Sequence, residues 1–174
     1  AWEKAFTNLN IKHELKWFYE KDKHAPKSYS AIHNVEEKLN MGDITLAKPE
    51  ELEDIDVLVY SPPCQAFSVA GKRKGIKDPR GKLFYDTLPI IKIKQPKYAL
   101  MENVKGLTDK GMIELFDDML TQLELLGYNN YWKVLNAVDY GIPQNRERVF
   151  VVSVRKDIDD GKFEFPSPLH NKLR

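Results

Sequence analysis

Short runs of apolar residues alternate with longer amphipathic stretches along the chain. Runs rich in β-branched and aromatic residues predict strands over residues 15–19, 55–60, 98–101, 132–137 and 148–154. Apolar positions spaced three or four apart predict helices over residues 2–9, 25–39, 83–94 and 112–126. Pro26 is tolerated only in the first turn of its helix, Pro89 should kink the third helix, and Gly127 suits the end of the fourth.

This alternation is typical of an α/β domain, with a mostly parallel sheet flanked by helices. The clearest strand is the apolar run 55–60, which ends abruptly at two prolines, Pro62 and Pro63. Ligands bind such sheets beyond the carboxyl ends of the strands. The residues that follow each predicted strand are therefore the first place to look for chemistry.

Composition indicates one folded domain and excludes several classes of protein. Of the 174 residues, 42% are hydrophobic and 30% charged, and the formal net charge is +1. A disordered chain would have fewer apolar residues or a larger net charge. No apolar run approaches the roughly 20 residues of a membrane span, and the first residues lack a signal-peptide pattern. The single cysteine cannot form an internal disulfide, which favours a reducing compartment, the cytoplasm.

That cysteine, Cys64, follows the predicted strand 55–60 in the sequence Ser61-Pro62-Pro63-Cys64-Gln65. A lone cysteine is often a buried structural thiol. Here the two prolines stiffen the approach, and the end of a strand offers the rigid, partly exposed position that a nucleophile needs. The position therefore favours a nucleophile over a structural thiol.

Charged residues stand at two further strand ends. Glu102 follows the run 98–101. A glutamate is most often a surface carboxylate. At the end of an apolar strand, however, partial burial would favour the protonated form of its carboxyl, which could then donate a proton at neutral pH. Arg146 and Arg148 stand at the start of the last strand. They could form a surface salt-bridge cluster with Glu147. Alternatively, one guanidinium would bind a nucleic-acid base and the other a phosphate or a structural carboxylate.

Residues 71–82 form a basic segment, with six Lys or Arg, one Asp and three glycines. Such a run is usually a solvated loop. Its place shortly after Cys64 also suits a mobile cationic flap that closes on a polyanion, with hinge freedom from the glycines.

Three motifs together resemble those of the C5-cytosine DNA methyltransferases. They are Pro63 to Ser68, Glu102 to Val104, and Gln144 to Arg148, in the order and spacing of that family. The likeness extends over residues 1–168. It implies a Rossmann-like, S-adenosylmethionine-dependent methyltransferase domain there, with residues 169–174 starting the connection to a target-recognition region.

The resemblance implies a covalent mechanism on a cytosine that is flipped out of the duplex. Cys64 would attack C6 of the ring, Glu102 would contact N3 and the exocyclic amine, and Arg148 would bind O2. Pro63 and Arg146 would complete the catalytic site. S-adenosylmethionine would supply the methyl group to C5, and loss of the C5 proton would release the thiol.

For S-adenosylmethionine the resemblance implies a pocket in the first third of the chain. Glu20 would accept hydrogen bonds from the ribose hydroxyls, Asp43 from the adenine amine, and Ile44 would present its backbone amide to the ring. Lys21 departs from the family, which often has an apolar or aromatic residue there, so its alkyl stem would have to cover the adenine. Two further residues would line this pocket, Pro63 and Leu83.

Contacts to double-stranded DNA are implied for Gln65, Ser68, Lys72, Arg73, Lys74, Arg80 and Gln144. Arg80 matches a loop position that contacts the DNA backbone or the flipped site. No metal is implied. The expected enzyme is a cytoplasmic restriction-modification or phage methyltransferase of bacterial type, for which a cognate restriction endonuclease would be a second partner.

Two segments of the family are not found in the sequence. The Gly-rich cofactor loop with its first strand is expected just before Ala1, and the recognition region after Pro168. The sequence is therefore expected to be part of a longer polypeptide or one subunit of a split enzyme, and inactive alone. Two other functions remain open: an RNA (tRNA) cytosine-5 methyltransferase on the same scaffold, and an inactive nucleic-acid-binding module. Residues 66–68 favour DNA, and the presence of all three catalytic residues argues against a pure binder.

Overall fold

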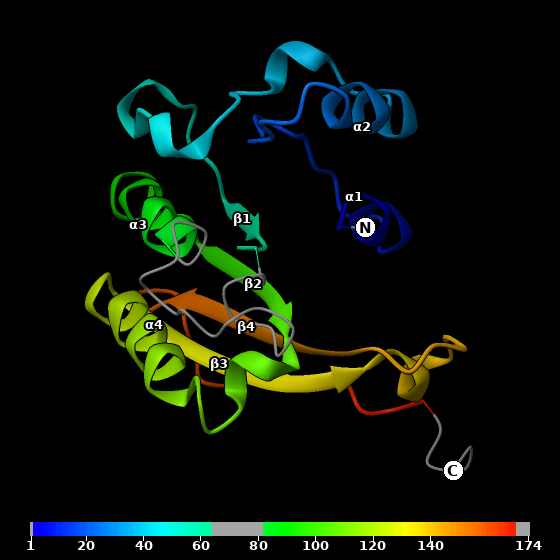
Figure 1. The fold of residues 1–174 in the computed structure, drawn as a ribbon, viewed down its shortest axis with the longest axis vertical. Helices are drawn as coiled ribbons and strands as arrows, with labels where there is room; N and C mark the ends of the chain where they lie inside the picture. Colours follow the sequence, from blue (N-terminus) through cyan, green and yellow to red (C-terminus); the bar gives the residue numbers. More distant parts are fainter. Residues whose placement is uncertain (1, 64–81, 170–174) are drawn as a thin grey trace. The chain divides into compact units, whose positions relative to one another are not determined.

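The computed structural model describes residues 2–63 and 82–169. They belong to two compact units, Ala1–Glu53 and Asp54–Arg174, coloured blue to cyan and cyan to red in Figure 1. The first unit consists of short helices and connecting loops, and the second contains the sheet. No helix in the described ranges is long and apolar enough to cross a membrane.

The helical elements of the first unit are α1 (Trp2–Asn8), α2 (Ala25–His33), η1 (Glu37–Leu39), η2 (Ile44–Leu46) and η3 (Pro49–Glu51). The helix predicted over 25–39 is shorter than expected. It ends at His33 because Asn34 takes the left-handed conformation, with φ 53°, and its N–H bonds the carbonyl of Ser30. The short polar side chain of asparagine tolerates this conformation. Pro26 lies in the first turn of α2, as predicted.

The strand predicted over 15–19 is wrong. Only Phe18 pairs, through an isolated parallel bridge to Asn40. A strand needs a neighbouring extended segment that bonds its backbone groups along its length. Here the residues directly before Asn40 form the 3-10 helix η1 instead, so the pairing does not continue. Trp17 is buried instead, and its indole N–H donates to the carbonyl of Glu53 at 3.0 Å.

Four strands form the sheet of the second unit, β1 (Val57–Tyr60), β2 (Tyr98–Val104), β3 (Tyr128–Asn136) and β4 (Glu147–Arg155). Their order is β1-β2-β4-β3. The pair β1–β2 is parallel, whereas β4 runs antiparallel to both β2 and β3. The α/β class is confirmed, but the described sheet is mixed rather than mostly parallel. The connection between β3 and β4, residues 137–146, is short and joins two adjacent strands. A parallel arrangement of these strands would need a crossover of a dozen or more residues.

Two strands are longer than the apolar pattern predicts, because polar residues inside them find partners. β2 continues to Val104 through Asn103, which is 2% exposed and hydrogen-bonded. β3 begins at Tyr128, a fully buried residue whose hydroxyl donates to the carbonyl of Pro96 at 2.7 Å. Ser153 in β4 is also fully buried, and its hydroxyl donates to Asn130 at 2.7 Å.

Two helices, α3 (Leu83–Lys94) and α4 (Ile113–Leu125), accompany the sheet (Figure 1). The largest fully buried side chains of this unit come from the helices and the strands together: Phe84, Ile90, Ile91, Met101, Phe116, Met119, Leu123, Tyr128, Val149 and Val151. Pro89 lies inside α3. Gly127 follows the end of α4 with φ +95°, which fits the predicted role of a glycine there.

Candidate functional site

The parallel pairing of β1 with β2 brings two strand ends together. Tyr60 is in register with Met101, so the next residues, Ser61 and Glu102, are neighbours. The hydroxyl of Ser61 lies 2.8 Å from Oε2 of Glu102 and 3.1 Å from its backbone oxygen. A hydroxyl has one proton, and a charged acceptor binds it more strongly, so the carboxylate is the better acceptor.

Arg148 reaches the same carboxylate from the neighbouring antiparallel strand. Its Nε lies 3.0 Å from Oε1 of Glu102, and the two side chains are 23% and 27% exposed. The register Val104–Arg148 makes this a diagonal pair across β2 and β4. Each carboxylate oxygen of Glu102 thus has a partner, the Ser61 hydroxyl at Oε2 and the Arg148 guanidinium at Oε1. Arg148 also donates through Nη1 to the carbonyl of Glu147 at 2.8 Å.

Asn103 fixes the loop that leaves β1. Its Nδ2 donates to the carbonyl of Pro62 at 3.1 Å, and its Oδ1 accepts from the N–H of Val104 at 2.8 Å. Pro62 is buried and Pro63 is exposed. The backbone that leads to the cysteine is thus held by a buried side chain of β2. Neither Ser61 nor Asn103 is predicted as a site residue from the sequence, where the available signal is a polar residue that follows an apolar run.

Most of the residues predicted to contact DNA, and the predicted nucleophile, lie outside the described residues: Cys64, Gln65, Ser68, Lys72, Arg73, Lys74 and Arg80. Gln144 and Arg146 are described and exposed. They lie in the connection between β3 and β4, and the guanidinium of Arg146 is not part of the Glu102–Arg148 pair. Within residues 2–63 and 82–169, no cluster of His, Cys, Asp or Glu is suited to hold a metal ion.

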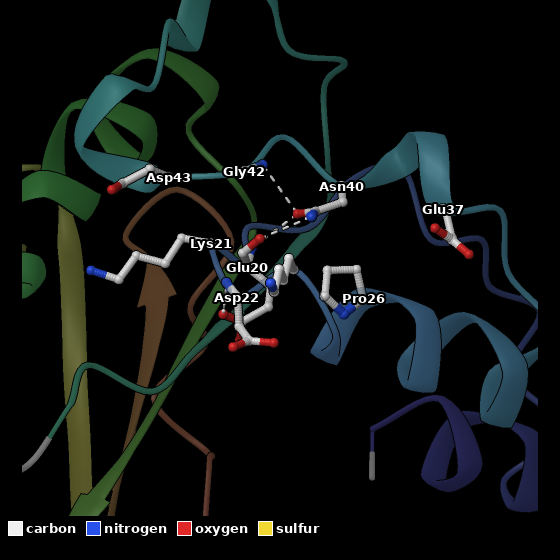
Figure 2. A pocket seen from close by; sticks show the side chains of 9 residues that line it. Glu20, Lys21, Asp22, Pro26, Glu37, Asn40, Gly42 and Asp43 are labelled. Atoms are coloured by element: carbon white, nitrogen blue, oxygen red, sulfur yellow. Dashed lines mark hydrogen bonds between the residues drawn. The ribbon is translucent and has the colours of Figure 1, made fainter.

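The first unit contains a polar pocket with a volume of about 590 Å³. Figure 2 shows the side chains that line it, Glu20, Lys21, Asp22, Lys23, Pro26, Glu37, Asn40, Gly42 and Asp43. Three of the residues predicted to bind the cofactor, Glu20, Lys21 and Asp43, are thereby brought together.

Asn40 connects two of the segments that line this pocket. Its Nδ2 donates to the carbonyl of Glu20 at 2.9 Å, while its Oδ1 accepts from the N–H groups of Glu20 at 2.9 Å and Gly42 at 3.1 Å (Figure 2). One carboxylate oxygen of Glu20 accepts from the N–H of Asp22 at 2.9 Å. The position of Glu20 is therefore fixed through both its backbone and its side chain.

Asp43 stands across the pocket as the cap of η2. Its Oδ1 accepts from the N–H of Thr45 at 3.0 Å and from the Thr45 hydroxyl at 2.9 Å. These hydrogen bonds, with a smaller contribution from the Lys21 ammonium, hold the pKa of Asp43 below its ordinary value. Ile44 follows as the first residue of η2.

The hydrogen-bond acceptors of Glu20 and Asp43 suit a nucleoside. Two carboxylates are the natural acceptors for ribose hydroxyls and an exocyclic amine, and both are held by backbone N–H groups. Leu83 and Pro63 belong to the second unit, so their place beside this pocket remains a prediction.

Comparison with known proteins identifies the family. The model of the C-5 cytosine-specific DNA methylase family matches residues 2–173. The orphan methyltransferase M.Rho11sI of Bacillus phage rho11s is 43% identical over 158 residues, which are 91% of this chain and 31% of that protein. The type II methyltransferase M.FnuDI of Fusobacterium nucleatum is 46% identical over 155 residues, 89% of this chain and 44% of the relative. The chain thus spans less than half the length of both relatives.

A solved structure agrees. The crystal structure of the S. pombe Dnmt2 methyltransferase superposes with a TM-score of 0.67 at 25% sequence identity, covering 95% of this chain and 49% of the other. Glu102 and Arg148, from two of the three motifs, pair with each other, and Glu102 also pairs with Ser61, in a chain that the family model matches over residues 2–173. The chain belongs to the C-5 cytosine-specific DNA methylase family.

Proposed function

We propose that this chain is the catalytic part of a DNA cytosine-5 methyltransferase that uses S-adenosylmethionine. The observation that carries the proposal is the Ser61–Glu102–Arg148 cluster in a chain of this family. Its first member, Ser61, lies three residues before Cys64 in the sequence. Residues 1–168 would form the catalytic domain, and residues 169–174 would begin the connection to a recognition region.

Cys64 acts as the nucleophile on a cytosine flipped out of the helix. Its thiolate forms a bond to C6, which places an electron pair on C5. C5 takes up the methyl group, the C5 proton then leaves to a base, and the Sγ–C6 bond breaks to release the thiolate. When bound, S-adenosylmethionine would supply this methyl group from its sulfonium, whose S–CH3 bond breaks to leave S-adenosylhomocysteine. Pro63 stiffens the chain just before the nucleophile.

Glu102 and Arg148 bind the cytosine edge, Glu102 at N3 and the exocyclic amine and Arg148 at O2. Charge that develops on the ring is stabilised by these fixed groups. Oε2 of Glu102 is available at low cost, because the Ser61 hydroxyl can turn to the backbone oxygen 3.1 Å away. Arg146 is available for a phosphate or a structural carboxylate.

The pocket of the first unit holds the cofactor. Glu20 binds the ribose hydroxyls, Asp43 the adenine amine, and the Ile44 backbone amide the ring. The stem of Lys21 covers the adenine, and Leu83 and Pro63 are further proposed contacts of the cofactor. The fixed carboxylates of the pocket support these roles.

Double-stranded DNA is contacted by residues of three segments. They are Gln65 and Ser68 after Cys64, Lys72, Arg73, Lys74 and Arg80 of the basic segment, and Gln144 of the connection between β3 and β4. The curated relatives are phage orphan and type II methyltransferases, which supports a cytoplasmic enzyme of restriction-modification type, with or without a cognate endonuclease.

The direct test is methyl transfer by the full protein from S-adenosylmethionine to duplex DNA and, separately, to tRNA. The proposal expects 5-methylcytosine in DNA, and loss of this activity in Cys64→Ser with DNA binding retained. Glu147→Gln is the matched control for Glu102→Gln, because Glu147 is an exposed carboxylate at the same end of the sheet, paired with Lys105. Transfer to tRNA alone would favour the RNA enzyme. DNA binding without transfer would favour an inactive module or a split subunit.

A further inference from the structure

The connection 137–146 between β3 and β4 is closed at its neck by one side chain. β3 ends at Asn136, which is in register with Glu147, the first residue of β4. The N–H of Ala137 donates to the carbonyl of Arg146 at 3.1 Å. The connection is therefore a closed loop that leaves the sheet at the end where Arg148 pairs with Glu102.

Asn136 bonds both arms of this loop. Its Oδ1 accepts from the N–H of Arg146 at 3.0 Å and from the N–H of Val138 at 3.4 Å. Its Nδ2 donates to Oδ1 of Asn145 at 2.7 Å. One amide group thus connects the end of β3 to the residues that lead into β4.

The arm that Asn136 holds carries polar and cationic side chains. Gln144, Asn145 and Arg146 are all exposed. Residues 140–146 contain no acidic residue. This arm is suited to contact a phosphate backbone, which Arg and Gln side chains commonly do.

The opposite arm has other attachments. Ile142 donates its N–H to the carbonyl of Ala137 at 3.2 Å, and the hydroxyl of Tyr140 donates to the carbonyl of Pro166 at 2.9 Å. In the described part of the chain, the side-chain bonds to Asn145 and to the N–H of Arg146 come from Asn136. Loss of Asn136 should therefore loosen residues 144–146 more than the rest of the loop.

We propose that Asn136 is a positioning residue that presents Gln144 and Arg146 to the phosphate backbone of the nucleic-acid substrate. This inference rests on the proposed function and adds a residue to it. Asn136 acts through the loop, so it should affect capture of DNA rather than the chemistry at Glu102.

The test compares three variants of the full protein on a mixed-sequence genomic DNA. Asn136→Leu removes all three hydrogen bonds at similar volume. Asn136→Asp keeps the oxygen that accepts from both N–H groups, and the Asn145 amide can turn to donate to it. Asn129→Leu is the matched control, since this exposed asparagine of the same strand makes one side-chain bond, to Asp159 at 2.6 Å.

Asn136→Leu should raise the KM for DNA about tenfold, the loss expected when a few hydrogen bonds and an ordered arm are removed, with kcat unchanged. The dependence of binding on salt should also become shallower as a phosphate contact is lost. Asn129→Leu should resemble the parent protein. Asn136→Asp keeps the loop bonds but adds a negative charge near the phosphate, so it should raise the KM less than Asn136→Leu does. In an Arg146→Ala background the effect of Asn136→Leu should shrink, because the side chain it positions is gone.

The outcomes separate the two claims. A parent protein that neither binds nor methylates DNA overturns the proposed function and this inference with it. An active parent in which Asn136→Leu leaves KM unchanged, or lowers kcat alone, overturns this inference only. If Asn136→Leu does not fold, Asn136→Ala removes the same three hydrogen bonds with a smaller side chain, and an unchanged KM there has the same meaning.

Discussion

Arg148 Nε and Glu102 Oε1 lie 3.0 Å apart across two antiparallel strands. The two residues belong to motifs far apart in the sequence, and the pairing of β2 with β4 brings them together. The β1–β2 pairing adds Ser61 from a third strand end. The cluster is therefore a product of sheet register: Glu102 lies within β2, Arg148 near the start of β4, and Ser61 directly after β1.

Glu102→Gln and Arg148→Lys should each lower kcat/KM for methyl transfer at least about a hundredfold, the typical loss when one preorganised electrostatic contact to the reacting group is removed. Lysine keeps the charge of Arg148 but cannot reproduce its planar fork of donors. Initial rates with DNA in excess measure the effect. Glu147→Gln serves as control, and a loss of similar size there would show that the pair has no special role.

Asn103→Leu should lower the free energy of unfolding by about 1–3 kcal/mol, because the carbonyl of Pro62 and the N–H of Val104 both lose a buried partner. Urea denaturation measures this. Asn129→Leu, at an exposed position, should change stability far less. Equal stability of the Asn103 variant and the parent would mean that the loop after β1 is held by other contacts.

Glu20→Gln should weaken binding of S-adenosylmethionine about tenfold or more, since hydrogen bonds to a charged acceptor are replaced by weaker ones. Isothermal titration calorimetry on the full protein gives the dissociation constant. Glu50→Gln is the control, because Glu50 is an exposed carboxylate of the same unit outside the pocket lining. The same affinity in both variants would remove Glu20 from the cofactor site.

The pKa of Asp43 should be measurably below 3.8, its ordinary value, because the Thr45 N–H and hydroxyl donate to the carboxylate. A carboxyl whose pKa is lowered by folding stabilises the folded state above pH 3.8 and loses that contribution as the pH falls through its own lower value. NMR titration of the carboxyl carbon measures it. Thr45→Val should raise the pKa part of the way back.

Thr7→Val is the control for that titration, because the Thr7 hydroxyl donates to the backbone oxygen of Glu3. A pKa of Asp43 that is the same in the parent and in Thr45→Val would contradict the hydrogen-bonded arrangement.

The α/β class, the end of β1 at Tyr60 and three of the four α-helices were predicted correctly from the sequence, because apolar runs mark strands and three-and-four spacing marks helices. The predicted helix 25–39 and the predicted end of β2 at residue 101 differ from the structure. The sequence did not predict that β4 runs antiparallel to its neighbours β2 and β3, since periodicity carries no information on strand direction. The strand over 15–19 failed for a related reason. Its apolar and polar residues do alternate, but Asn40, the bridge partner of Phe18, directly follows the 3-10 helix η1. The partner segment is therefore not extended enough to form a ladder.

The motif residues Glu102 and Arg148 were found by type and order, whereas the supporting residues were not. Ser61 and Asn103 act through side-chain hydrogen bonds to residues 41 positions away, and Asn136 through bonds across one loop. Such contacts depend on register and on rotamers, which a single sequence does not reveal. A lone polar residue at the end of an apolar strand was the only available sign.

The central claim is that Cys64 attacks C6 of cytosine, and a duplex containing 5-fluorocytosine tests it most directly. Fluorine at C5 cannot leave as a cation, so the Sγ–C6 bond should persist after methyl transfer. The full protein, given this duplex and S-adenosylmethionine, should form a stable covalent adduct whose mass maps to the peptide containing Cys64, and Cys64→Ser should form none. Methylation of ordinary cytosine at C5 by a Cys64→Ser protein, or an adduct on another residue, would contradict the account.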